Sequence, residues 1–198
     1  MAPSLDIEHL GSTLMQLSVA VPEATELFLD VVPDQTWWSP LLAPICGPSL
    51  IIKPLCRPFF EEIAGTLTVE ENLLSLVTAH FPAGTSNKNW EHYMQMARNG
   101  TRFFDYGTNG NLAAYGTPYP RAYNFSGYSV PSSVYFSSAD KLVSNYAIEI
   151  TFSLLPPSSI VKKRNLTGYG HFEFAWGPQA KVDIYNEIIA DINTLEGM

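Results

Sequence analysis

Apolar residues recur at helical spacing in several stretches of the chain. Residues 12–31 are predicted to be helical, with a break at Pro22, which suits the first turn of a helix. The second half of this stretch places four apolar side chains on one face: Ala24, Leu27, Phe28 and Val31. Another helix is predicted to open at the capping-box sequence Thr68-Val-Glu-Glu71, and a further one covers residues 87–98. The core face of that last helix is expected to carry Trp90, Tyr93, Met94 and Ala97.

Residues 37–60 combine aromatic side chains with closely spaced prolines. The aromatic residues are Trp37, Trp38, Phe59 and Phe60, and prolines stand at positions 40, 44, 48, 54 and 58. Because proline is unfavourable inside a helix, any helix in this stretch is expected to be short. Two interpretations stay open on composition alone, namely a lid over an apolar site and a corner of the core.

The second half of the chain has a different pattern. Residues 103–128 are rich in glycine and aromatic residues and are predicted to form a loop. The β-branched residues that follow predict a strand over 129–136, and a second strand is predicted over 159–163. Helices are predicted from Asp140 to about Leu155 and from about Gln179 to Asn193. The inner face of the last helix is expected to carry Val182, Tyr185, Ile189 and Ile192.

The order strand, helix, strand, helix predicts an α/β fold, with a parallel sheet covered by helices. Sheets of this kind bind ligands at the carboxyl ends of their strands. Asp140 follows the first predicted strand, and His171 follows the second after a Gly-Tyr-Gly turn. In α/β-hydrolases the triad acid precedes the triad base along the chain, as these two residues do. Each residue alone has a simpler explanation, since an Asp before a helix is commonly an N-cap and a single loop histidine commonly has no catalytic role.

Composition narrows the classes of function. With 198 residues, 46% of them hydrophobic and 15% charged, the chain can bury a sizeable core as one domain or as part of a larger one. The net charge of −8 argues against binding to nucleic acid or to anionic lipid through basic residues. No apolar run approaches the roughly 18–20 residues of a membrane-spanning helix.

Short motifs give conflicting indications about the compartment. The N-terminus has no basic region, apolar core or small-residue cleavage site, so no signal peptide is predicted. Three N-x-[ST] sequons, at Asn99, Asn124 and Asn165, are candidate glycan acceptors in a secreted protein. Cys46 and Cys56 could close a short disulfide loop in an oxidising compartment and would be ordinary buried thiols in a cytosol. No zinc site is predicted, because no histidines accompany the two cysteines at ligand spacing. No other metal site and no cofactor is predicted.

Six sequence strings resemble the acid lipase family, which comprises the lysosomal and gastric lipases and their insect relatives. They occur in the family's order and close to its spacing: His80-Phe-Pro-Ala-Gly-Thr-Ser86, Asn89-Trp-Glu-His-Tyr93, Phe104-Asp-Tyr-Gly107 with Asn111 and Tyr115, Val130-Pro131 leading to Asp140, His171-Phe-Glu-Phe-Ala-Trp-Gly177, and Val182-Asp-Ile-Tyr-Asn-Glu-Ile-Ile189. The opening Met1-Ala-Pro-Ser4 resembles the stretch that follows the family's nucleophile-bearing strand and helix. The segment around Cys46 and Cys56 resembles the cap and lid region, which favours the lid interpretation.

The resemblance implies the C-terminal part of an α/β-hydrolase sheet with a helical cap, the N-terminal half of the fold being absent. Residues 1–20 would follow the nucleophile-bearing region, residues 21–100 would form the cap or lid, and residues 101–198 would form the C-terminal core. It also implies that Asp140 is the triad acid and His171 the triad base.

Two strings that contain the candidate catalytic residues depart from the family pattern. Ser137-Ser-Ala-Asp140 stands where the family usually has Gly-Gly-x-Asp. His171-Phe-Glu-Phe174 stands where it has His-Leu-Asp-Phe. Both changes keep the two candidate catalytic residues, so they do not change the expected roles.

The nucleophile that this chemistry needs is not in the printed sequence. No G-x-S-x-G string occurs, and Ser86, in the nearest string, lacks the second glycine and opens a predicted helix. We therefore expect a lipase or carboxylic-ester hydrolase of lipid metabolism whose chain alone is inactive. The resemblance implies triacylglycerol or sterol-ester substrates at a lipid–water interface, no cofactor, and a secreted or lysosomal location. The alternative is a catalytically inactive lipase-like protein that binds lipid or a lipase partner.

Overall fold

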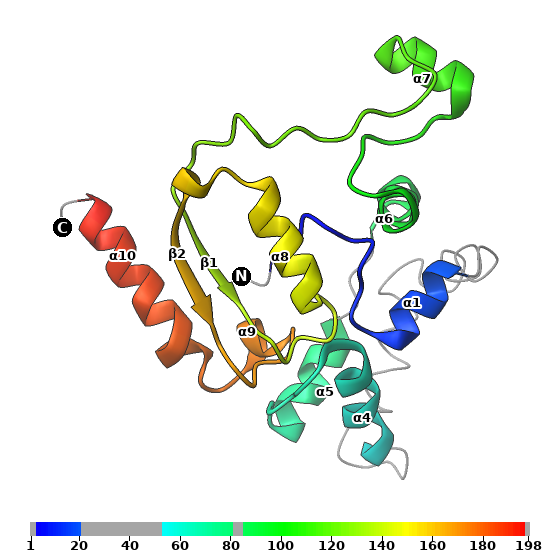
Figure 1. Cartoon of the computed structure of the whole chain (residues 1–198). Coiled ribbons are helices and arrows are strands. Elements are labelled where there is room, and N and C mark those ends of the chain that lie inside the picture. Colours follow the sequence, from blue (N-terminus) through cyan, green and yellow to red (C-terminus); the bar gives the residue numbers. More distant parts are fainter. Residues whose placement is uncertain (1–2, 21–52, 81–84, 197–198) are drawn as a thin grey trace.

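A computed structural model describes residues 3–20, 53–80 and 85–196 of the chain. Two parallel strands, β1 (Ser132–Phe136) and β2 (Ile160–Asn165), lie between α8 (Asn145–Leu154) and α10 (Asn186–Glu196) (Figure 1). Helices α1 (Thr13–Ala20), α4 (Lys53–Ala64) and α5 (Glu71–His80) lie together at the end of the molecule toward which the strands point (Figure 1). The remaining elements are α6 (Asn87–Asn99), α7 (Gly107–Tyr115), the short helices η1 (Pro157–Ser159) and α9 (Glu173–Trp176), and the π-helical turn η2 (Lys181–Tyr185).

The predicted pair of strands and their parallel direction are confirmed. The strands pair from Ser132 to Phe136 and from Ile160 to Asn165, with an irregularity in register between Ser132 and Ser133. Successive side chains of a strand point to opposite faces, and here the two faces have different partners. Tyr135 packs with Ile184 in the cluster on the α10 side, whereas Phe136 packs against the cluster of Val143, Ala147 and Ile148 on the α8 side.

The last predicted helix is present, but its predicted inner face is largely wrong. Tyr185 packs against the core cluster, whereas Val182, Ile189 and Ile192 are 62%, 55% and 46% exposed. Ile184 is fully buried, and Ile188 packs beside it. The segment carries two interleaved apolar rows, and the π-helical turn before α10 changes the angle between successive side chains. The row that faces the sheet is therefore the one that contains Ile184 and Ile188.

The expectation of short helices around the prolines is wrong for α4, which has 12 residues with Pro58 inside it. A proline inside a helix removes one backbone hydrogen bond. Here the apolar face compensates, because Cys56, Phe60 and Ala64, spaced four residues apart, are all buried. Trp37 and Trp38 lie outside the described residues, as does the predicted helix beyond Pro22.

Helices α5 and α6 confirm two further predictions, although the capping box is wrong. Helix α5 begins at Glu71, and the Thr68 hydroxyl bonds the side chain of Glu173 instead of capping the helix. In α6, Ser86 caps the first turn by accepting a hydrogen bond from the backbone of Asn89. The core face of α6 is as predicted for Met94 and Ala97, which are buried, while Trp90 and Tyr93 are half-buried and stacked on each other.

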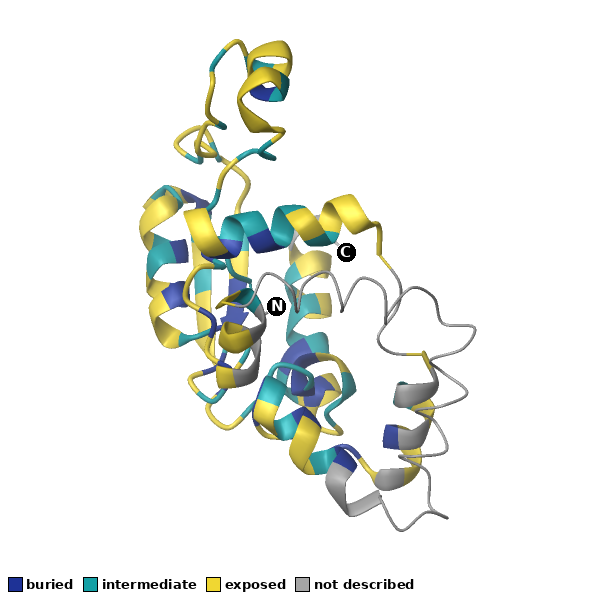
Figure 2. Ribbon diagram, turned by 90° about the vertical axis from the view of Figure 1, so that its right-hand side faces the viewer, coloured by how far each residue is buried: buried dark blue, intermediate teal, exposed yellow. Residues whose placement is uncertain are grey.

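Residues 103–128 are not the uninterrupted loop that their composition predicts, because they contain helix α7. The helix projects from the rest of the molecule, and its surroundings are mostly exposed (Figure 2). We call residues 100–131 the aromatic lobe. Within the described part of the chain, no helix has the length and apolar character needed to cross a membrane.

Candidate active site

Asp140 lies in the turn that follows β1, where the backbone fixes its carboxylate. Its Oδ1 atom accepts hydrogen bonds from the backbone N–H groups of Leu142 (2.8 Å) and Val143 (2.9 Å). The Asp140 side chain is only 2% exposed. Burial and two donated hydrogen bonds hold one carboxylate oxygen in place, so the other oxygen has a fixed direction.

That second oxygen faces His171, which lies beyond the end of β2. His171 Nδ1 is 2.9 Å from Asp140 Oδ2, and the His171 side chain is 26% exposed. The structure therefore brings together the two residues that the sequence singled out. A carboxylate can only accept a hydrogen bond, so Nδ1 carries the proton in this contact. In the neutral ring, Nε2 is then the basic nitrogen.

The C-terminal end of α4 joins the two turns that carry this pair. The carbonyl of Ala64 accepts hydrogen bonds from the backbone N–H groups of His171 (2.6 Å) and Lys141 (3.5 Å). Gly65, with φ of +87°, pairs with Asp140 in an isolated antiparallel bridge. A side chain on Gly170 would lie 2.1 Å from the carbonyl oxygen of Thr66, so only glycine allows this close backbone contact.

A second backbone segment supports the Asp140 turn from the N-terminal part of the chain. Leu10 forms an antiparallel bridge with Val143, and the N–H of Gly11 donates to the carbonyl of Leu142. A Cβ atom on Gly11 would be 2.4 Å from the carbonyl oxygen of Lys141. Segments from three distant parts of the sequence thus converge on Asp140 and His171.

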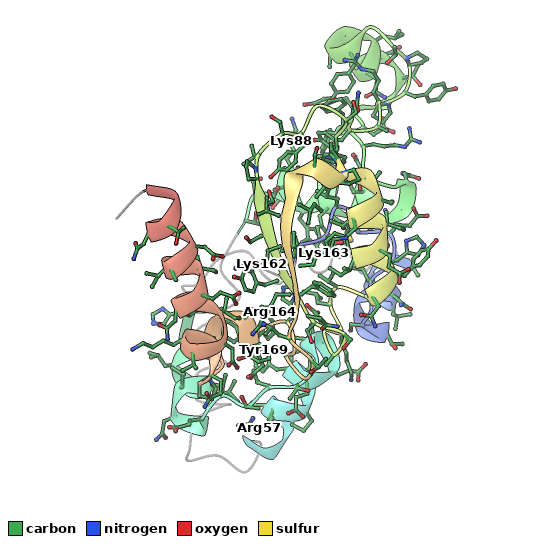
Figure 3. The ribbon with its side chains drawn as sticks, turned by 60° about the vertical axis from the view of Figure 1, so that its left-hand side comes forward. Arg57, Lys88, Lys162, Lys163, Arg164 and Tyr169 are labelled. Atoms are coloured by element: carbon green, nitrogen blue, oxygen red, sulfur yellow. The ribbon has the colours of Figure 1, made fainter. Side chains whose placement is uncertain are left out.

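Glu173 is a buried residue near this site that sequence analysis did not single out for a role. Its carboxylate accepts hydrogen bonds from both the backbone N–H and the hydroxyl of Thr68. On α4, Arg57, which is labelled in Figure 3, donates to the carbonyls of Leu67 and Val69. Residues 67–69 are therefore bonded by both charged side chains. The departure from the family pattern at Glu173 marked the position, but only the structure shows what its side chain contacts.

Lys162 on β2 and Tyr169 in the turn after it both have raised pKa values. Burial, together with a hydrogen bond donated to Asp183, raises the pKa of the Tyr169 hydroxyl. Hydrogen bonds to Asp191 and then to Glu187 raise the pKa of the Lys162 ammonium group. Lys162 and Tyr169 are labelled in Figure 3. These contacts join β2 and the segment before α9 to η2 and α10. None of them includes Asp140 or His171.

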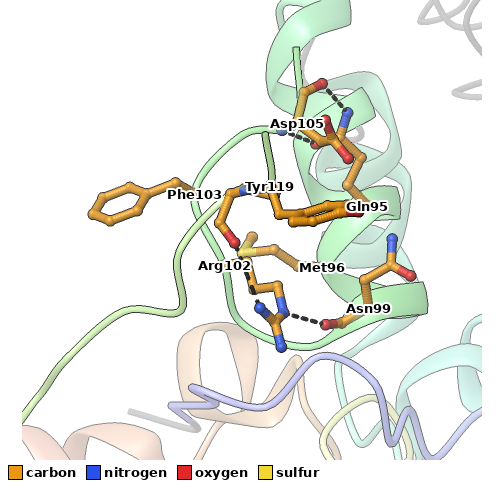
Figure 4. A pocket seen from close by; sticks show the side chains of 8 residues that line it. Gln95, Met96, Asn99, Arg102, Phe103, Asp105 and Tyr119 are labelled. Carbon is orange, nitrogen blue, oxygen red and sulfur yellow. Dashed lines mark hydrogen bonds between the residues drawn. The ribbon is translucent and has the colours of Figure 1, made fainter. Parts of the chain in front are cut away.

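Two clefts of the described residues are lined by residues other than Asp140 and His171. One of about 400 Å³ lies between α6 and the aromatic lobe and is lined by Gln95, Met96 and Tyr119, among others (Figure 4). Within it the Gln95 side-chain amide is bonded to the backbone of Asp105 at both its oxygen and its nitrogen. A second cleft, of about 250 Å³, lies between the N-terminal segment and the same lobe.

The described residues contain one group with the spacing of metal ligands. Asp6, Glu8 and His9 place one ligand atom each within 4.8 Å of one another. The pair Asp6–His9 is already joined, since His9 Nδ1 lies 2.7 Å from Asp6 Oδ2. This gives the chain a second Asp–His contact, in which the histidine is more exposed, at 42%, than His171 is.

The remaining sequence candidates lie apart from this pair. Cys56 is disulfide-bonded, whereas Cys46 lies outside the described residues, so the Cys46–Cys56 loop stays a prediction. Asn99, Asn124 and Asn165 are all exposed, at the end of α6, in the aromatic lobe and at the end of β2. Exposure suits a glycan acceptor, and their glycosylation remains a prediction.

An acid and a histidine after successive strands of a parallel sheet, in that order, is an arrangement used by serine hydrolases of the α/β class. Comparison with known proteins narrows this class. No protein-family model matches the chain. Lipase lipl-1 of Caenorhabditis elegans is 34% identical over 149 residues, which is 73% of this chain and 37% of the relative.

Vertebrate lipases give the same result. The gastric triacylglycerol lipase of Bos taurus is 31% identical over 69% of this chain and 35% of its own length. A putative lysosomal acid lipase/cholesteryl ester hydrolase of Crotalus adamanteus is 27% identical over 96% of this chain and 48% of its own length. The resemblance to the acid lipases is confirmed: the chain is homologous to the lysosomal and gastric lipases and the lipl lipases. It spans between about a third and a half of the length of these relatives.

Proposed function

We propose that this chain supplies the acid and the base of a serine lipase or carboxylic-ester hydrolase of the acid lipase type. The observation that carries the proposal is the contact between His171 Nδ1 and Asp140 Oδ2 at 2.9 Å. The buried carboxylate fixes the tautomer of the imidazole, and the ring is partly exposed to solvent. The names of the relatives support an ester of a fatty acid, either a triacylglycerol or a cholesteryl ester, as the substrate class.

In the proposed reaction, His171 Nε2 takes the proton of a serine hydroxyl as that oxygen attacks the ester carbonyl. The imidazolium that forms is stabilised by Asp140, which stays ionised. His171 then gives the proton to the leaving alcohol, and the acyl group remains on the serine until water releases it by the reverse sequence. Because the printed sequence contains no G-x-S-x-G, the serine and its oxyanion hole would belong to polypeptide outside it.

The Asp140–His171 pair would lie in a hydrolase core that is covered by a cap. Residues 21–100 would form a cap over the acyl chain, and residues 101–198 would complete the hydrolase core at a lipid–water interface. A secreted or lysosomal location agrees with relatives that are gastric and lysosomal lipases. A secreted protein encounters an oxidising environment, which would suit the disulfide at Cys56 and glycans at the three sequons.

The first experiment is to determine the sequence of the native transcript upstream of Met1 and to express the longest reading frame. If that frame adds a G-x-S-x-G segment, the protein should hydrolyse a chromogenic short-chain ester. His171→Ala should then lower kcat/KM by at least about 10³-fold, the scale of losing a triad member. His9→Ala is the matched control, since it removes the other Asp-paired histidine and should leave turnover intact.

Two results would contradict the proposal. One is a His171→Ala enzyme with turnover close to that of the original protein. The other is a transcript whose frame begins at Met1 and whose product is stable but does not hydrolyse esters. In that second case the question becomes whether a lipase-like protein binds lipid or a lipase partner.

A further inference from the structure

We propose that Glu173 is a positioning residue for His171, acting through the segment 64–68. The inference rests on the proposed function, in which His171 is the base. Glu173 does not touch the reacting atoms in this arrangement. It holds the backbone to which the His171 turn is attached, and thereby sets the contact between His171 and Asp140.

The carboxylate of Glu173 is committed to one partner residue. Oε1 accepts the backbone N–H of Thr68 and Oε2 accepts its hydroxyl, each at 2.5 Å. Glu173 is only 4% exposed, and the two residues are 105 positions apart in the chain. A buried carboxylate is costly unless it is hydrogen-bonded, so a two-oxygen contact of this kind fixes both partners.

The His171 turn and the segment 64–68 are therefore joined at two points. The first is the bond from the His171 N–H to the Ala64 carbonyl, at 2.6 Å, and the second is the Glu173–Thr68 contact. Between these points Gly170 lies so close to Thr66 that an added Cβ would be 2.1 Å from its carbonyl oxygen. Two attachments on either side of a close backbone contact leave little freedom for one segment to rotate against the other.

The opposite side of the same segment is held by Arg57. Its guanidinium donates to the carbonyls of Leu67 and Val69, whose side chains are buried. Removing Glu173 would leave Arg57 bonded to the carbonyls of this segment without an opposing contact at Thr68. Residues 65–68 would then be free to shift toward Arg57, and the end of α4 at Ala64 would be displaced with them.

A shift at Ala64 would reach the catalytic pair directly. The Ala64 carbonyl is the shared acceptor for the N–H groups of His171 and Lys141, and Lys141 is the neighbour of Asp140. The two turns keep their relative position partly through this one oxygen. The 2.9 Å contact between His171 Nδ1 and Asp140 Oδ2 therefore depends on the position of residues 64–68.

The test measures the tautomer of His171 by the ¹⁵N shifts of its imidazole in the full 198-residue chain. In the original chain the Nδ1–H form should dominate, because Asp140 accepts that proton. Glu173→Ala should produce a several-fold fall in the ratio of Nδ1–H to Nε2–H forms. Glu173→Gln should restore most of this ratio, because its amide oxygen can still accept the Thr68 N–H.

Two further variants separate positioning from general stability. Asp183→Asn is the control, since it weakens another carboxylate contact of the C-terminal region, that with Tyr169 Oη at 2.7 Å. It should lower the unfolding free energy without changing the His171 tautomer. Thr68→Val removes only the hydroxyl bond to Glu173, and should give a smaller change of the tautomer ratio than Glu173→Ala.

Each outcome is decisive for one proposal. An unchanged tautomer ratio in folded Glu173→Ala would overturn the positioning role, and if that variant does not fold, an unchanged ratio in Thr68→Val would do so. An original chain in which His171 is mainly in the Nε2–H form would instead contradict the proposed function, because Asp140 would then not be accepting the Nδ1 proton.

Discussion

The sheet region and the aromatic lobe are ordered by different interactions. Around β1 and β2, apolar side chains form clusters on both faces, with Tyr135 and Ile184 on one side and Val143 and Ile148 on the other. Of residues 100–131, all of which the structure describes, only Asn111 is buried. Figure 2 shows this contrast between the projecting lobe and the strands. The sheet region thus has an apolar interior, whereas the centre of the lobe is an amide side chain.

The side-chain amide of Asn111 makes three hydrogen bonds within the lobe. Its Nδ2 donates to Asp105 Oδ1 (2.7 Å) and to the Pro118 carbonyl (3.1 Å), and its Oδ1 accepts the Tyr106 N–H (2.9 Å). Local hydrogen bonds of this kind fix a loop but bury little apolar surface. We therefore expect the lobe to open at lower free energy than the sheet region, as a separate unit.

The largest effect should follow a change in the apolar interior. Ile184→Ala removes most of a fully buried side chain and should lower the free energy of global unfolding by about 2–5 kcal/mol in urea denaturation. Ile189→Ala, in the adjacent helix α10, is the control, because Ile189 is 55% exposed and its loss should change stability by less than about 0.5 kcal/mol. Similar losses in both variants would mean that α10 packs in a different orientation.

A smaller and local effect should follow a change at the centre of the lobe. Asn111→Ala leaves buried polar groups without partners and should destabilise the lobe by about 1–3 kcal/mol. Hydrogen exchange should show this as faster exchange of the amides of α7, with unchanged exchange in β1 and β2. Asn109→Ala, at an exposed position of the same helix, should leave the exchange rates unchanged. Equal acceleration in lobe and strands would show that the two regions unfold together.

The same contrast explains which elements could be predicted from the sequence. Strand β1 follows from a run of β-branched and aromatic residues, and the burial of Val134 and Tyr135 confirms that signal, whereas no residue of β2 is buried. Helix α7 could not be predicted, because Gly107-Thr-Asn-Gly-Asn111 has low intrinsic helix propensity. It forms where Asp105 and Asn111 bond its first turn and Gly116, with φ of +72°, ends it.

Tertiary packing determines the buried face of α10 and the length of α4, which the sequence predicted wrongly. The sequence of α10 offers two apolar rows, and only the sheet determines which of them is buried. Pro58 argues against a helix locally, but α4 buries every fourth residue around it. In both places a tertiary contact outweighs a local preference.

The candidate site was predictable only in part. The order of Asp140 and His171 after two strands could be read from the chain, because the carboxyl ends of parallel strands lie at one edge of a sheet. The contact of Glu173 with Thr68 could not, because it joins residues 105 positions apart without a repeating pattern. Nor could the shared acceptor at Ala64, since a backbone carbonyl leaves no signature in the sequence.

The smallest effects on stability should follow the loss of one cation–π contact in each region. Lys88 Nζ lies 4.4 Å from the ring centre of Tyr106 in the lobe, and Lys163 Nζ lies 4.0 Å from that of Phe152 on α8. Contacts of this kind at exposed positions contribute about 0.5–1 kcal/mol. Lys163→Met should therefore lower the global unfolding free energy slightly, whereas Lys88→Met should only accelerate amide exchange in the lobe. If Lys88→Met lowered global stability as much as Lys163→Met, the lobe would be part of the cooperative unit of the sheet, and the distinction drawn from Asn111 would not hold.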